Sequence, residues 1–100
     1  MRPYTILIVE DEPAVFEGMN RLLKRNGYEA LPPATTGIEA IESVKTNAPD
    51  LLILMDIALK GEMDGIEAAL HIKEISDAPV IYLSTHFDEK TFERASIEDV

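Results

Sequence analysis

The stretch LLILMD, residues 51–56, decides the fold and raises the question of function. Its five consecutive apolar residues are typical of a strand that is buried on both faces of a sheet. A carboxylate follows directly, at Asp56. A buried core favours another aliphatic residue there, and a turn favours Gly, Asn or Ser. The role of Asp56 therefore depends on where the other acids of the chain lie.

The rest of the chain alternates between short apolar runs and helical patterns. Apolar runs predict strands at 4–9, 28–31, 51–56 and 80–83. Apolar spacings of three and four residues predict helices at 13–25, 35–47, 64–75 and from 88 onward. Strands that alternate with helices indicate a parallel sheet with helices on both faces. Pro32 and Pro33 place the strand at 28–31 at an edge of that sheet.

Local signals indicate where the helices begin and end. Pro13 suits a first helical turn, and Gly27 suits the residue just after a helix. Thr35 or Thr36 is expected to cap the second helix, and Asp64 the third. Their apolar stripes are expected to be Ile38, Ile41 and Val44 in the second helix, and Ile66, Ala69, Leu70, Ile72 and Ile75 in the third.

Composition limits the classes of function. A chain of 100 residues suggests a single domain, and 19 acidic against 9 basic residues give a formal net charge of −10. This charge disfavours direct binding of nucleic acid and suits divalent cations. The absence of cysteine excludes disulfides and thiolate metal sites. We expect a cytoplasmic protein that does not enter the membrane, because no apolar run could span a bilayer and no signal-peptide pattern opens the chain.

Acids follow two of the predicted strands directly. Glu10, Asp11 and Glu12 follow the first strand, Asp56 ends the third, and Ser84 follows the fourth. Binding sites of open parallel sheets lie beyond the carboxyl ends of the strands. Carboxylates crowded together there raise one another's pKa values, and a hard cation such as Mg²⁺ removes that penalty.

Three motifs carry a resemblance to a known family. ILIVEDE, LLILMDIALKGEMDG and PVIYLST occur in this order, at residues 6–12, 51–65 and 79–85. Together they resemble the receiver domain of two-component response regulators, over residues 4 to about 95. The resemblance implies a flavodoxin-like, doubly wound parallel sheet of order 2-1-3-4-5. The fifth strand and the last helix of that fold have no counterpart in this chain.

The resemblance also implies the role of each site residue. It makes Asp56 the acceptor of a phosphoryl group and assigns Mg²⁺ to Glu10, Asp11, Asp56 and the backbone carbonyl of Ala58. Ser84 takes the place of the hydroxyl residue that contacts the phosphoryl group and takes part in the switch.

The implied function is phosphorelay signal transduction. A sensor histidine kinase would supply the phosphoryl group, and the domain would change conformation to control an output domain or partner protein. A receiver is not an enzyme in the ordinary sense, although it promotes its own phosphorylation and dephosphorylation.

The chain departs from the family pattern at its end. Receivers carry a Lys at the end of a fifth strand, an aromatic switch residue and a last helix, whereas this chain ends in SIEDV. We therefore expect residues 1–100 to be a single receiver domain that is incomplete at its C-terminus. The strand at 80–83 would then be an exposed apolar edge, which favours a homodimer or a swapped dimer.

Other classes of protein fit less well or remain open. A phosphatase of the haloacid dehalogenase type would need a second acid two residues after Asp56, where Ala58 stands. A flavodoxin would need a Gly- and hydroxyl-rich loop after the first strand, where the chain has EDEP. A pseudo-receiver, which binds partners without taking phosphate, remains an alternative because the Lys is missing.

Overall fold

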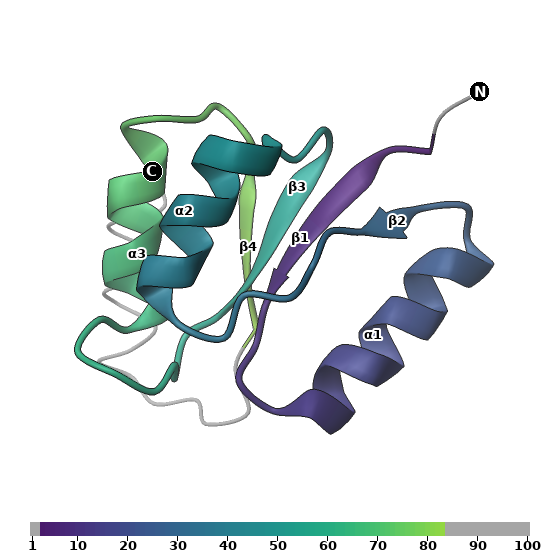
Figure 1. Ribbon diagram of the computed structural model, residues 1–100, viewed down its shortest axis with the longest axis horizontal. Coiled ribbons are helices and arrows are strands. Elements are labelled where there is room, and N and C mark those ends of the chain that lie inside the picture. The colour runs from purple at the N-terminus through teal and green to yellow at the C-terminus, as the bar shows by residue number, and fades with distance from the viewer. Residues whose placement is uncertain (1–2, 84–100) are drawn as a thin grey trace.

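The computed structural model describes residues 3–83 of the chain. Its elements follow the order β1 (Thr5–Val9), α1 (Pro13–Arg25), β2 (Glu29–Ala30), α2 (Gly37–Asn47), β3 (Leu52–Asp56), α3 (Gly65–Lys73) and β4 (Val80–Leu83). The four strands pair in parallel in the order β2-β1-β3-β4. Helix α1 lies on one side of this sheet, and α2 and α3 lie on the other (Figure 1). The predicted doubly wound parallel sheet of order 2-1-3-4 is confirmed.

The strand register assigns each apolar side chain to a face of the sheet. Leu7 pairs with Ile53, and Ile53 pairs with Val80, so the three side chains share one face. These three residues belong to the main hydrophobic core, which also contains buried residues of α2 and α3. The core therefore lies between the sheet and the α2–α3 layer.

The opposite face of the sheet is covered less completely. None of the residues of α1 is buried, and Leu22 is 57 % exposed. Ile81 pairs with Leu54 on this face and is 47 % exposed. Within residues 3–83, the outer strands of the sheet are β2 and β4.

The predicted caps agree with the structure. The Thr36 hydroxyl accepts a hydrogen bond of 3.1 Å from the Glu39 N–H and begins α2. The Asp64 carboxylate accepts one of 2.9 Å from the Glu67 N–H and begins α3. Gly27, with φ of 85°, takes the left-handed conformation after α1 that glycine adopts without strain. The helix expected from residue 88 lies outside the described residues.

The predicted apolar stripes of the second and third helices are only partly right. In α2, the buried residues are Gly37, Ala40 and Val44, whereas Ile38 is 62 % exposed. Helix α2 begins with Gly37 packed against α3, and this turns the adjacent Ile38 outward. In α3, Ile66, Ala69 and Ile72 are buried as expected, but Leu70 is 43 % exposed. Ile75, beyond the end of α3, is also exposed.

None of the helices within residues 3–83 combines the length and the apolar character that a membrane crossing requires.

Candidate metal and phosphoryl-acceptor site

Pairing of β1 with β3 brings the acids of two motifs together. Val9 pairs with Met55, so the next residues, Glu10 and Asp56, lie side by side at the carboxyl edge of the sheet. Glu10, Asp11 and Asp56 each offer a carboxylate oxygen, and these three oxygens lie within 4.8 Å of one another. We call these three residues the acidic site.

Two of the three acids are deeply buried. Glu10 is 7 % exposed and Asp56 is 8 % exposed, while Asp11 is half-buried. They line a cavity of about 180 Å³, whose other lining residues are Glu12, Val15, Ala58 and Lys60. Carboxylates are seldom buried in this way unless an opposite charge or hydrogen bonds compensate them.

Backbone amides supply one hydrogen bond to each carboxylate. The Glu12 N–H donates to Glu10 Oε1 at 3.1 Å, and the Ala58 N–H donates to Asp56 Oδ1 at 3.1 Å. The Lys60 N–H donates to Asp11 Oδ2, also at 3.1 Å, across 49 positions of sequence. The loop between β3 and α3 thus holds two of the acids, although they follow different strands.

The environment favours protonation within the site. Burial raises the pKa of Glu10 to about 7; the Glu12 N–H opposes this rise, and the charges of Asp56 and Asp11 add to it. Burial also raises the pKa of Asp56, with a further contribution from the charge of Asp11. The interaction between the two side chains raises the pKa of Glu10 further and lowers that of Asp56. The site as built therefore carries more negative charge than its surroundings compensate.

A hard divalent cation fits this set of donors. The ligand atoms are all carboxylate oxygens, which Mg²⁺ and Ca²⁺ prefer, and Mg²⁺ typically takes one or two carboxylates together with waters. A cation would compensate the charge that burial and mutual repulsion leave on the three acids. The acidic site can therefore hold a metal ion.

Comparison with known proteins identifies the family. The family model of the response regulator receiver domain matches residues 6–99. This chain belongs to the response regulator receiver domain family. Receiver domains are signalling domains of two-component systems, and they interact with kinases and output domains.

Curated relatives of this receiver domain are regulatory and chemotaxis proteins. It is 42 % identical over 84 residues to the transcriptional regulatory protein YvrH of Bacillus subtilis, covering 84 % of this chain and 35 % of that protein. It is 40 % identical over 72 residues to the chemotaxis protein CheY of Bacillus subtilis, covering 72 % of this chain and 58 % of that protein. The receiver domain thus spans between about a third and three fifths of the length of these relatives.

Solved structures share the fold of this receiver domain. The signal receiver domain of a modulated diguanylate cyclase from Desulfovibrio desulfuricans superposes with a TM-score of 0.89 at 30 % identity, covering 97 % of this chain and 76 % of that one. A CheX–CheY–BeF3–Mg complex from Borrelia burgdorferi gives 0.85 at 26 % identity, with 96 % and 72 % covered.

The remaining predicted site residues are placed only in part. Ala58 is exposed at the rim of the cavity, and its N–H contacts Asp56; the role of its carbonyl as a metal ligand stays a prediction. Ser84, the predicted phosphoryl contact, lies outside the described residues. Glu12 is exposed and serves the site through its backbone, while its carbonyl accepts hydrogen bonds from the first turn of α1.

Two residues of the β3–α3 region were not predicted to bear on the site. Lys60 contributes a backbone N–H to Asp11, and no residue type signals a contact that the backbone makes. Gly65 approaches the backbone of Asp56 closely. The sequence did contain a signal for this close approach. Gly65 directly follows Asp64 at the start of a predicted helix, where glycine lowers helix propensity, and such a glycine often has a packing reason.

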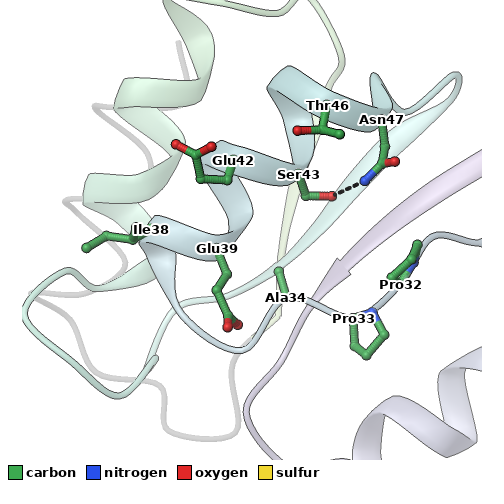
Figure 2. Close-up of a pocket in the computed structure, with 9 residues that line it drawn as sticks. All are labelled: Pro32, Pro33, Ala34, Ile38, Glu39, Glu42, Ser43, Thr46 and Asn47. Carbon is green, nitrogen blue, oxygen red and sulfur yellow. Dashed lines mark hydrogen bonds between the residues drawn. The ribbon is translucent and has the colours of Figure 1, made fainter.

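A larger groove lies elsewhere, along α2 (Figure 2). It has a volume of about 360 Å³ and is lined by Pro32, Pro33, Ala34, Ile38, Glu39, Glu42, Ser43, Thr46 and Asn47. Its polar groups bond locally: the Asn47 amide donates to Ser43 Oγ at 3.2 Å, and Glu39 Oε1 accepts two hydrogen bonds of 2.7 Å from Thr35. We call this region the α2 groove; it shares no residue with the cavity of the acidic site.

Proposed function

We propose that this receiver domain accepts a phosphoryl group on Asp56 from a sensor histidine kinase. Mg²⁺ would be held by Glu10, Asp11, Asp56 and the backbone carbonyl of Ala58. The observation that carries the proposal is the convergence of three carboxylate oxygens within 4.8 Å at the carboxyl edge of the sheet. The family of the chain and the position of Asp56 at the end of a buried strand support it.

The chemistry follows from the character of the Asp56 carboxylate. One of its oxygens would attack phosphorus and form an acyl phosphate, while the bond from phosphorus to the donor's imidazole nitrogen breaks and the imidazole leaves. Attack requires the ionised carboxylate, whose pKa burial raises in this protein. Mg²⁺ would offset the charge of the acids and of the phosphoryl oxygens.

The proposed output is a change of conformation near the acceptor. A phosphoryl group brings about −1.5 to −2 charges and strong acceptor oxygens. Ser84 is the next residue in the sequence after β4, and β4 pairs with β3 up to Asp56. We propose that Ser84 contacts the phosphoryl group and that the resulting shift controls an output domain or partner protein.

Further expectations accompany this function. We expect a cytoplasmic domain without direct nucleic-acid contact, in keeping with the net charge of −10. Pairing through the outer strand β4, as a homodimer or a swapped dimer, stays a prediction that size-exclusion chromatography with light scattering would test. It also stays a prediction that residues 1–100 form a single receiver domain that lacks the family's fifth strand and last helix.

Intact-mass spectrometry tests the acceptor. The chain is incubated with Mg²⁺ and acetyl phosphate, and we expect a gain in mass equal to one phosphoryl group. Asp56→Asn should abolish the gain because the amide is not a nucleophile, whereas Glu42→Gln, an acid of the α2 groove, should leave it unchanged. A gain that persists in Asp56→Asn would refute Asp56 as the acceptor.

The same experiment separates the alternative function. A pseudo-receiver would bind its partner without covalent change, so the folded wild-type chain would show no gain in mass. Binding of Mg²⁺ without such a gain would assign the acidic site to cation binding and leave a protein-interaction module as the function.

A further inference from the structure

Gly65 contacts the backbone of the proposed acceptor. It is the first residue of α3 and is buried, and its N–H donates to the Ile57 carbonyl at 2.9 Å. A Cβ atom at Gly65 would overlap the carbonyl oxygen of Asp56 and would come within 2.9 Å of the Asp56 carbonyl carbon and of Ile57 Cα. Backbone atoms at the end of a paired strand cannot move aside as the tip of a side chain can.

The other glycines of the chain differ from Gly65 in what surrounds them. A Cβ at Gly37 would approach the flexible Met63 side chain, at 2.9 Å from its Sδ and 3.0 Å from its Cγ, and the Ala68 Cβ at 3.2 Å. A Cβ at Gly18, inside α1, would meet no atom within 4 Å, and the same holds at Gly27 and Gly61, which have positive φ. Among the five glycines, therefore, only Gly65 lies against the backbone of the acidic site.

The contact at Gly65 lies at the closing point of the loop that holds the acids. The Ile57 N–H donates to the Leu83 carbonyl at 3.1 Å and fixes the start of the loop to β4. The Ile57 carbonyl accepts a hydrogen bond from the Gly65 N–H, which joins the end of the loop to its start. Between these ties, the loop supplies the Ala58 N–H to Asp56 and the Lys60 N–H to Asp11. A displacement of α3 away from β3 would therefore move both donors relative to their carboxylates.

We propose that Gly65 is a positioning residue for the acidic site. Because Gly65 has no side chain, α3 can begin directly against the backbone of Asp56. This position of α3 determines the path of the loop whose backbone amides donate to Asp56 and Asp11. The inference rests on the proposed function, since it assigns Gly65 to the same site. It adds a residue that touches neither the cation nor the phosphoryl group.

Three Gly→Ala variants test the proposal in the full chain. Gly65→Ala is compared with Gly37→Ala, which also crowds a helix start but meets the side chains of Met63 and Ala68 and no backbone atom, and with Gly18→Ala, which adds a methyl group without a clash. Two-dimensional amide NMR spectra report on Ala58 and Lys60 directly. We expect Gly65→Ala to shift both resonances and to speed their hydrogen exchange, and the other two variants to leave them near their wild-type positions.

Titration with Mg²⁺ alone gives the second readout. We expect Gly65→Ala to weaken the affinity for Mg²⁺ about tenfold, equivalent to about 1.4 kcal/mol. Gly37→Ala should keep the wild-type affinity even where its loss of stability in urea is similar. This separation of affinity from stability is a result that a purely structural role for Gly65 would not give.

Each outcome has a defined meaning. Unchanged Ala58 and Lys60 amides in folded Gly65→Ala would overturn the proposal, as would equal losses of affinity in Gly65→Ala and Gly37→Ala. If wild type binds no Mg²⁺, the proposed cation site fails, and the amide spectra still decide the role of Gly65. If Gly65→Ala is unfolded in buffer, the spectra are recorded in about 1 M trimethylamine N-oxide, which favours the compact state; failure to fold there would also overturn the proposal.

Discussion

The acidic site and the α2 groove both contain carboxylates, but their surroundings act on these groups in opposite directions. In the acidic site, burial and the neighbouring acids raise the pKa values of Glu10 and Asp56. In the α2 groove, hydrogen bonds from Thr35 lower the pKa of the exposed Glu39. The protein thus destabilises the charges of Glu10 and Asp56 in the smaller cavity and stabilises the charge of Glu39 in the larger groove.

This contrast bears on where a ligand acts. A carboxylate with a lowered pKa already has its partners and gains little from a cation. Carboxylates with raised pKa values gain free energy when a cation binds, because the cation replaces the missing compensation. A bound cation would therefore stabilise the acids of the smaller cavity more than Glu39 of the larger groove.

The largest expected difference between the two regions is their effect on how the free energy of unfolding changes with pH. Glu10 has an ordinary pKa of 4.5 and a folded-state pKa of about 7, so between these values the folded state binds more protons than the unfolded state. Metal-free stability should therefore fall as pH rises from about 4.5 to about 7, by roughly 3 kcal/mol from this group. The raised pKa of Asp56 acts in the same direction.

Urea unfolding at pH 5.5 and pH 8, in the presence of a chelator, measures this dependence. Glu10→Gln should reduce the fall and should make the domain more stable than wild type at pH 8, since it removes a charge that burial destabilises. Wild-type stability that rises over this interval, or a slope that Glu10→Gln leaves unchanged, would contradict the assignment.

The α2 groove should respond with the opposite sign and a smaller size. Glu39→Gln should lower the free energy of unfolding at pH 8 by about 0.5 kcal/mol, because it weakens two exposed hydrogen bonds to Thr35. Thermal unfolding followed by circular dichroism measures the change. If Glu39→Gln stabilised the domain, the surroundings of Glu39 would destabilise its charge, as those of Glu10 do, and the contrast between the two regions would be wrong.

Sequence patterns predicted the strand ends that build the acidic site. Glu10 and Asp56 follow apolar runs that are typical of a parallel sheet covered on both faces, and parallel pairing of β1 with β3 brings the two carboxylates to the same edge. Turn and cap chemistry predicted Thr35 or Thr36 as the cap of α2, together with Asp64 and Gly27, because each acts through its own side chain or its own φ.

Features that depend on tertiary packing could not be predicted in this way. Periodicity placed Ile38 and Leu70 in apolar stripes, but which residues of a helix are buried depends on how it packs against its neighbour. The Lys60 amide reaches Asp11 through the path of a loop, and backbone donors carry no residue-type signature. The raised pKa of Glu10 depends on burial that only the assembled site provides.

Isothermal titration calorimetry with Mg²⁺ at pH 8 tests the central claim, that Glu10, Asp11 and Asp56 form a cation site, most directly. We predict that the wild-type chain binds one ion, that Asp11→Asn loses this binding, and that Glu42→Gln in the α2 groove retains it. Undiminished binding in Asp11→Asn, or no binding by the folded wild-type chain, would contradict the claim.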